Sequence, residues 1–398
     1  MTFFLNRDIN RLAAHTTLHA LAWSFCGLFS AVFLLRQNVS VSGVFLAFAA
    51  ILLLRLALRP LVLMLAPRAG LRRTLMLGTL LHALQSPMLA LVHGGGAMLT
   101  LFCVVAAVGQ VFYWTAYHAY FAAMGDAELR GAQVAVREVL SAVAGTLGPA
   151  AGGLVLAELG AWPAFLTAFA IELAAALPLV RVSEPAIAAA DRGSLYADAQ
   201  TGIWLFVSDG WITSSAVTAW SIIMFRAASG RYDAFGSLLA IAALAAALSG
   251  MLLGRFIDLG HARRLTRANA AILMASLILK SVCGEDPLAV IIVAVSTTLL
   301  SGLYIPALMS AVYNESKLSP CPLRFQFAAE GGWDVGGSLS CLLCAVLLKF
   351  DLPLGVLILI ALPMVPVQMR LLMASYQRSG RVQAARKARE GAQVSMAG

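Results

Sequence analysis

Charged side chains are scarce in this sequence. Only 12% of its 398 residues are charged and 61% are apolar, whereas ordinary soluble domains carry about 25% charged residues. The chain therefore has too few polar residues to cover a soluble globule. Its apolar runs, such as 41–66 and 97–123, reach the length of about 20 residues that a helix needs to cross a bilayer. These features predict an integral membrane protein.

The motifs that covalent chemistry would need are also missing. The sequence contains no Gly-x-x-x-x-Gly-Lys phosphate loop and no His-Glu-x-x-His zinc motif. Cys341 and Cys344 form a C-x-x-C pair, but it lies inside an apolar span without a second pair or a histidine at ligand spacing. Helix packing is therefore the better interpretation. We expect no enzymatic activity, no cofactor and no metal site.

The apolar runs are continuous, which predicts helices. In lipid every backbone group must be bonded within the protein, and the ten-residue alternation of a membrane barrel does not occur in this sequence. We expect an all-α membrane protein with twelve transmembrane helices. The expected spans are 12–35, 41–66, 73–93, 97–123, 133–157, 162–181, 202–226, 234–254, 267–283, 288–313, 325–349 and 352–374.

The distribution of Lys and Arg sets the expected orientation, because cytoplasmic loops hold an excess of these residues. With both termini in the cytoplasm, 23 of the 28 Lys and Arg residues fall on the cytoplasmic side. This count includes Arg55 and Arg59, near the end of the second span. The net charge of +9 then reflects topology, and we expect no nucleic-acid partner.

A long internal loop divides six spans from six, and the two halves form a weak repeat. Tyr113 corresponds to Tyr304 and Glu138 to Glu330, at offsets of 191 and 192 residues. A parallel repeat of this kind puts a binding site between the halves, near the middle of the bilayer. The expected divisions are an N-terminal bundle at 1–181, a cytoplasmic linker at 182–201, a C-terminal bundle at 202–376 and a basic, disordered tail at 377–398.

Two motifs resemble the major facilitator superfamily, of the bacterial twelve-helix type, and the resemblance extends over essentially the whole chain. The loop after the eighth span, with Gly254, Asp258, Arg263 and Arg264, is similar to the cytoplasmic G-x-x-x-D-x-x-G-R-R signature with one extra residue. The first-half copy has Pro67 near the position of the aspartate. The resemblance implies two pseudo-symmetric six-helix bundles, and it puts the first-half gate in doubt.

The fifth span carries the second motif, Gly148-Pro149-Ala-Ala-Gly152-Gly153, which is similar to a motif of proton antiporters in that family. Glycines four residues apart let helix backbones approach closely, and proline removes a helical hydrogen bond. The segment can be a sliding surface between the halves or plain tight packing. Asp258 with Arg263 and Arg264 can close the cytoplasmic mouth or anchor the topology. We further expect a gate-side ion pair at Arg137 and Glu138.

Ionisable residues inside the spans are candidates for function by default. Asp209 lies about 10 Å inside the seventh span, and its repeat counterpart in the first span is His19. The resemblance implies that spans one, four, seven and ten line a central cavity, which puts the two residues on opposing walls. Both groups can exchange protons. The alternative is a fixed structural pair.

The eleventh span offers a second acidic site. Glu330 and Asp334 share one helix face, and two ionised acids one turn apart repel each other. At least one should stay protonated unless Arg324 or Arg137 compensates it. Glu172, in the sixth span, ranks lower because that helix is normally peripheral in the family.

Aromatic and polar residues of the cavity-lining spans are candidates for solute binding, with ordinary helix packing as the alternative. They are His15, Gln110, Tyr113, Trp114, Tyr117, Trp211 and Tyr304.

The expected function is secondary active transport of a small organic solute by alternating access, coupled to protons and directed outward. The alternatives are a proton-coupled metabolite importer and a non-transporting sensor or scaffold. Import would be favoured by an arginine deep in the cavity-lining spans, and none occurs there. Expected partners are the solute, protons and membrane lipid. We expect a monomer in the bacterial cytoplasmic membrane.

Overall fold

A computed structural model describes residues 7–124, 130–185, 196–257, 262–301 and 304–378. For a few of these it gives the backbone alone, namely 130–138, 249–257, 262–265, 300–301 and Pro306. The described chain folds into helices joined by turns and short connections.

The helices of the first part of the chain are α1 (Arg7–Cys26), η2 (Gly27–Phe29), α2 (Ser30–Arg36), α3 (Val41–Leu58), α4 (Pro60–Ala69), α5 (Leu71–Ala83), α6 (Gln85–Ala90), α7 (Ala97–Met124), α8 (Arg130–Glu158) and α9 (Ala161–Leu179). Those of the second part are α10 (Gln200–Ala227), α11 (Tyr232–Ile257), α12 (Ala262–Val282), α13 (Pro287–Ser301), α14 (Tyr304–Leu318), α15 (Pro322–Leu347), η3 (Leu348–Phe350) and α16 (Leu354–Leu359). A further helical stretch covers 364–378.

Each of the twelve predicted spans is occupied by one or more of these helices. The second span, 41–66, divides at Pro60, which begins α4 because proline has no N–H to donate to the preceding turn. Within the described residues, seven helical segments are long and apolar enough to cross a membrane. The prediction of an all-α membrane protein is confirmed.

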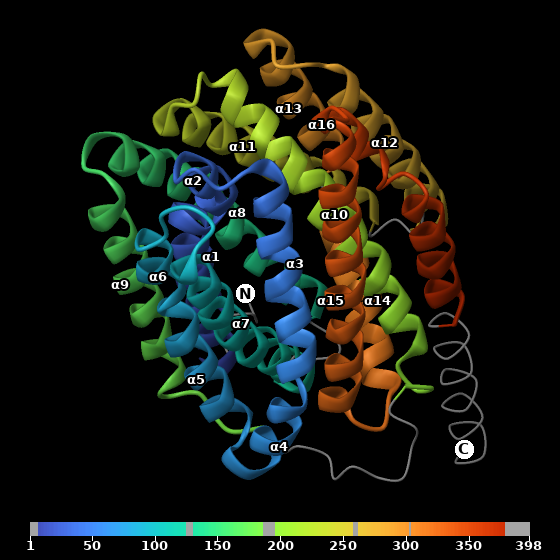
Figure 1. Ribbon diagram of the computed structural model, residues 1–398. Helices are drawn as coiled ribbons and strands as arrows, with labels where there is room; N and C mark the ends of the chain where they lie inside the picture. Colours follow the sequence, from blue (N-terminus) through green and yellow to red (C-terminus); the bar gives the residue numbers. More distant parts are fainter. Residues whose placement is uncertain (1–6, 125–129, 186–195, 258–261, 302–303, 379–398) are drawn as a thin grey trace, which may run out of the picture.

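The helices of the first part gather on the left of Figure 1, and α12 to α16 lie on the right. In the first group α1 packs against α8 and α9, and α5 packs against α7 and α9. In the second group α10 packs against α15 and α16. Contacts between the groups come from α3 and α7 against α15 and from α8 against α11. These five helices therefore form most of the interface between the two groups.

Glycines allow α8 to pack closely on α1 and on α11. A Cβ atom at Gly148 would lie 2.6 Å from Cβ of Ser24 in α1, and one at Gly153 would lie 2.5 Å from the carbonyl oxygen of Tyr232 in α11. A Cβ at Gly152 would likewise collide with the backbone of Phe25. The glycines predicted to serve a gate thus lie where helix backbones meet.

We expect Gly153→Ala to lower the melting temperature of the purified protein, whereas Gly145→Ala should not. Both glycines lie on α8, so both substitutions gain the same helix propensity, up to about 1 kcal/mol. Only Gly153 faces a backbone; a Cβ at Gly145 would meet Cβ of Ala243 at an ordinary 3.7 Å. Overpacking costs about 1–3 kcal/mol. Equal melting temperatures for the two variants would contradict the close α8–α11 contact.

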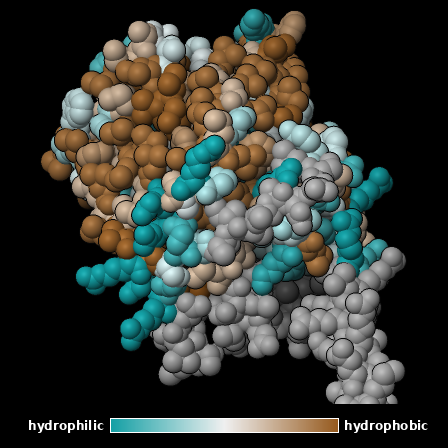
Figure 2. All heavy atoms as spheres, turned by 90° about the horizontal axis from the view of Figure 1, so that it is seen from below, coloured by the Kyte–Doolittle hydropathy of each residue, from teal (hydrophilic) through white to brown (hydrophobic). Residues whose placement is uncertain are grey.

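The outside of the helices is apolar. Leu46, Leu147 and Leu177 expose 46%, 62% and 69% of their surfaces, as expected for side chains that face lipid. Figure 2 views the molecule from the lower end of Figure 1 and shows hydrophilic side chains gathered in a zone beside broad hydrophobic areas. On the face seen in this view, the polar residues are thus gathered in one zone.

Candidate functional site

Buried polar side chains form a layer between two hydrophobic clusters. Along α3 and α4, Ile51 belongs to the first cluster and Val62 to the second, with Arg55 and Arg59 between them. The same order recurs along α1, α7, α9, α10 and α15, so the layer crosses both groups of helices. Its members are His15, His19, Arg55, Arg59, His82, Gln85, Gln110, Glu172, Asp209, Glu330 and Asp334.

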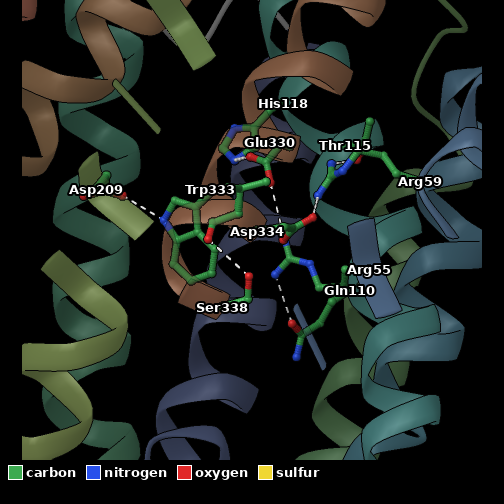
Figure 3. A network of polar contacts seen from close by, with 11 residues as sticks. Arg55, Arg59, Gln110, Thr115, His118, Asp209, Glu330, Trp333, Asp334 and Ser338 are labelled. Carbon is green, nitrogen blue, oxygen red and sulfur yellow. Dashed lines mark hydrogen bonds and ion pairs between the residues drawn. The ribbon is translucent and has the colours of Figure 1, made fainter. Parts of the chain in front are cut away.

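Ion pairs join α3 to α15 within this layer (Figure 3). Arg55 Nη2 lies 3.3 Å from Glu330 Oε2 and 3.0 Å from Asp334 Oδ1. Arg59 follows one turn later, on the same face, and its Nη2 donates to Asp334 Oδ2. All four side chains are buried, with at most 5% exposed. The pairs therefore hold together two helices from different groups.

Helix α7 completes this network. Arg55 Nη1 donates to Gln110 Oε1 at 3.1 Å, and Arg59 Nη1 donates to Thr115 Oγ1 at 2.8 Å. His118 Nε2 lies 3.4 Å from Glu330 Oε1. We call these seven residues the interface network. It combines positioned cations, anions and a histidine, from three helices.

The two arginines and two acids of the interface network balance each other in charge. Arginine stays protonated in proteins, so two permanent positive charges lie on the α3 side. Taking one partner out of a buried pair costs about 3–5 kcal/mol, because the other charge is left uncompensated. Separating α3 from α15 therefore requires water, a charged solute or a proton at the acids. The arrangement can link movement of the helices to charge.

Asp209 lies beside this network, on α10. Its Oδ1 accepts a hydrogen bond from Tyr304 Oη at 2.6 Å and its Oδ2 accepts one from Trp333 Nε1 at 2.9 Å. The Trp333 ring in turn lies under the Arg55 guanidinium, 5.5 Å from its carbon. These donors are neutral, as is Thr213, which also contacts the carboxylate, and no ion pair to Asp209 occurs in the described part of the chain. Its carboxylate differs in this from Glu330 and Asp334.

His19 belongs to a different cluster from Asp209. Its Nδ1 lies 2.8 Å from Glu172 Oε1 on α9, and His82 Nδ1 on α5 lies 3.4 Å from the same oxygen. Tyr113 stacks on the His19 ring at a centroid distance of 4.0 Å. The repeat partners His19 and Asp209 thus have separate contacts, because Glu172 of the sixth span points inward. The expected peripheral position of the sixth span thus does not apply to the side chain of Glu172, which is buried.

The remaining predicted cavity residues divide between the layer and its surroundings. The Trp114 ring packs edge-on to His19 at a centroid distance of 5.5 Å and stacks on His118 at 5.6 Å. It therefore lies between the interface network and the cluster of His19, His82 and Glu172. Tyr117 Oη accepts a bond from Thr16 at 3.4 Å. The Nδ1 atom of His15 bonds the carbonyl of Ala175 on α9.

Trp211 makes its hydrogen bond away from both clusters. Its Nε1 donates to the carbonyl of Ile360, at 2.8 Å, and so ties α10 to the end of α16. Five predicted gate residues have side chains outside the described part of the structure, namely Arg137, Glu138, Asp258, Arg263 and Arg264, and Gly254 is described by its backbone alone. The expected ion pair of Arg137 with Glu138 therefore lies outside the described residues.

Arg55 and Arg59, which were counted with the cytoplasmic side, lie among the buried side chains between the helices. They are 3% and 1% exposed and they supply the positive charge that was expected from Arg324 or Arg137. The signal was present in the sequence: both residues fall inside the predicted span 41–66, four residues apart and therefore on one helix face. His82 could have been found in the same way, because it is a titratable residue inside the predicted span 73–93.

Both ends of the interface are in contact. At the start of α3, Ser42 Oγ donates to the carbonyl of Ala345 near the end of α15 at 3.3 Å, and Phe29 packs edge-on to Phe235 of α11. At the other end, the rings of Phe121 on α7 and Tyr313 on α14 lie 4.9 Å apart. The two groups of helices therefore enclose the polar layer from both sides.

Comparison with solved structures supports the fold. The chain is similar to the human organic anion transporter MFSD10 (TETRAN), at 14% identity and a TM-score of 0.63 over 92% of this chain and 99% of that one. It is similar to the nucleoside transporter NupG at 12% identity and a TM-score of 0.62, over 92% of this chain and 99% of that one. It is also similar to the Escherichia coli fucose:proton symporter FucP at 13% identity and a TM-score of 0.65, over 92% of this chain and 98% of that one. At these identities the similarity concerns the fold alone.

Sequence comparison supplies the family. No curated protein matches the sequence significantly. A model of the Major Facilitator Superfamily, however, matches residues 12–319, which is more than half of the chain. Its members are transporters of small molecules and not enzymes. The chain therefore belongs to the major facilitator superfamily of secondary transporters.

Proposed function

We propose that the protein exports a small organic solute in exchange for protons, by alternating access between two bundles at 1–181 and 202–376. The linker 182–201, the basic tail 377–398 and both termini are cytoplasmic in this proposal, and the protein acts as a monomer in a bacterial cytoplasmic membrane. Without Arg55 and Arg59, 21 of the 28 Lys and Arg residues (23 minus 2) still fall on the cytoplasmic side, against five outside.

The observation that supports alternating access in this proposal is the buried ion pairing of Arg55 and Arg59 with Glu330 and Asp334. It connects one bundle to the other, and it can separate only when the charges find new partners. Asp209 is the proposed proton site, because its hydrogen bonds come from neutral donors. Gly153 belongs to the proposed sliding surface on α8 because it faces α11 of the other bundle, whereas Gly148 and Gly152 pack against α1 of their own bundle.

The predicted residues have different roles in this proposal. In this proposal Glu330 and Asp334 act on the rate of conformational exchange, and Asp209 carries the proton. Gln110, Tyr113, Trp114, Tyr117 and Tyr304 are the proposed solute contacts, since they lie in or next to the polar layer. Aromatic faces and amide groups suit a weakly charged, partly apolar solute.

Import of an anionic metabolite is the second candidate. The buried Arg55 and Arg59 favour it, because two permanent positive charges in contact with α7 can bind a carboxylate or a phosphate. Arg55 lies on α3 and Arg59 directly after its end, however, and both already pair with Asp334 of α15. A non-transporting sensor or scaffold is the third candidate and would tolerate loss of the buried charges.

The direction of coupling can be tested in proteoliposomes. Organic cations, organic anions, sugars and nucleosides would first be screened for the largest rise in melting temperature of the purified protein. The best compound, radiolabelled, is expected to accumulate in vesicles that are acidic inside. In an antiporter, protons that leave the vesicle drive the solute into it. Accumulation in alkaline vesicles instead would establish symport and contradict export. Binding without accumulation under either gradient would favour a sensor.

A further inference from the structure

The cluster of His19, His82 and Glu172 has no counterpart in the transport proposal. Its members come from three helices, α1, α5 and α9, which the sequence separates by up to 153 residues. Two imidazole nitrogens and a carboxylate oxygen lie within 4.8 Å of one another. The side chains are at most 6% exposed. The fold therefore brings three ligand-type atoms to one buried point.

Part of this cluster has unused hydrogen-bonding capacity. Glu172 Oε2 and His82 Nε2 are buried and have no hydrogen-bond partner among the described residues. A buried polar atom without a partner costs about 1–3 kcal/mol. Nδ1 of both histidines faces a single oxygen, Glu172 Oε1, at 2.8 and 3.4 Å. The carboxylate thus retains lone pairs that neither histidine uses.

We propose that His19, His82 and Glu172 bind a divalent transition-metal ion of the zinc class. Imidazole and carboxylate are zinc ligands, with bonds of about 2.0–2.2 Å, and two histidines with one glutamate form a known type of open zinc site. Tetrahedral bonds of this length put ligand atoms about 3.4 Å apart. The distances of 2.8 and 3.4 Å require only a small adjustment, and the fourth position is open to a small ligand.

The surroundings suit a fixed metal site. Tyr113 stacks on the His19 ring and Trp23 lies beside His82, at centroid distances of 4.0 and 6.1 Å, so both imidazoles are held by packing. Bundle cores commonly build metal sites from side chains of facing helices. A metal ion here would tie α1 to α5 and α9, within the first group of helices and beside the interface network, whose residues are not among its ligands. Its binding does not depend on the transport proposal.

Cobalt(II) provides a direct test, because its visible absorption reports the ligands and geometry around the ion. The full chain, purified without a histidine tag, is expected to bind one Co²⁺ with an absorption spectrum typical of a four-coordinate site, and Zn²⁺ should displace it. His82→Gln and Glu172→Gln should each lower the affinity by more than about 100-fold, since loss of even an outer partner costs 10–100-fold. The matched control, His93→Gln, alters an exposed histidine and should leave binding unchanged.

A ligand-preserving variant protects the test against misfolding. His82→Cys is expected to keep Co²⁺ bound and to add absorption from the thiolate, which only a metal bound at this position can produce. The proposal would be overturned if the wild-type protein bound no Co²⁺ when the ion is present at millimolar concentration. So would equal affinity in the wild type and in well-folded His82→Gln protein, which would put the metal elsewhere and leave the cluster as internal hydrogen bonds.

Discussion

Arg59→Met and Asp334→Leu are each expected to destabilise the protein by about 3–5 kcal/mol, whereas the double variant should recover most of the loss. Either single change leaves one uncompensated charge in a buried site. Removal of Arg59 leaves Arg55 facing Glu330 and Asp334, and removal of Asp334 leaves both arginines facing Glu330. The double variant restores a balanced pair, and apolar replacements of a buried ion pair are often tolerated.

The measurement is a double-mutant cycle of melting temperatures in detergent. Arg226 and Glu285 provide the matched control, because they form an ion pair of 2.9 Å whose side chains are 46% and 51% exposed. Exposed pairs contribute about 0–1 kcal/mol, so Arg226→Ala should have little effect. A double variant that is no more stable than the worse single variant would contradict the coupling of Arg59 to Asp334.

The same double variant separates folding from transport. In the proposed cycle the charges of Arg59 and Asp334 exchange partners when the bundles separate. Methionine and leucine have no such exchange and would expose apolar surface to water instead. We therefore expect a folded protein with slow or absent solute exchange. Wild-type rates in this variant would leave the interface network with a structural role alone.

The architecture was predictable because it depends on the lengths of apolar runs. A span needs about 20 residues with little charge, and each of the twelve predicted windows contains helix in the structure. The interruptions within the windows were less visible. The 3₁₀ turn at Gly27–Phe29 has no strong local signal, whereas the break before Pro60 follows from the missing N–H of proline.

The central ion pairs were missed because a loop rule was applied to residues inside a span. Arginines near a cytoplasmic end normally count as topological anchors. Arg55 lies about 21 Å along α3, at 1.5 Å for each of 14 residues after Val41, and this depth is similar to that of Asp334 in the antiparallel α15. A comparison of the depth of each charged residue along its helix would have matched Arg55 with Asp334. The sequence analysis singled out the acids but did not identify the arginines that pair with them.

The contacts of His19 could not be read from the repeat. Equivalent positions in two halves need not face each other, because each side chain also depends on its neighbours within its own half. Glu172 and His82 lie on helices that flank α1, and helix order within a bundle is not contained in an apolar pattern. The repeat did identify Tyr304, whose hydroxyl bonds Asp209.

Asp209→Asn should abolish solute-driven proton movement while solute binding and exchange persist. Asp209 is 8% exposed, and a proton can be added to it without breaking an ion pair with any described residue. Asparagine keeps the shape but has a single acceptor oxygen for the two donors, Tyr304 and Trp333. One hydrogen bond is therefore lost, at a cost of about 1–3 kcal/mol, which a folded membrane protein of ordinary stability can tolerate.

A pH-sensitive dye inside proteoliposomes would follow the protons, and exchange of radiolabelled solute would follow binding and movement. Asp351→Asn is the control, because Asp351 is exposed and has a left-handed φ of 53°, which asparagine adopts readily. It should couple normally. If Asp209→Asn also couples normally and Asp334→Asn does not, the proton site belongs to α15. The arginines would then release a protonated Asp334 during the cycle, and Asp209 would only position Trp333 and Tyr304.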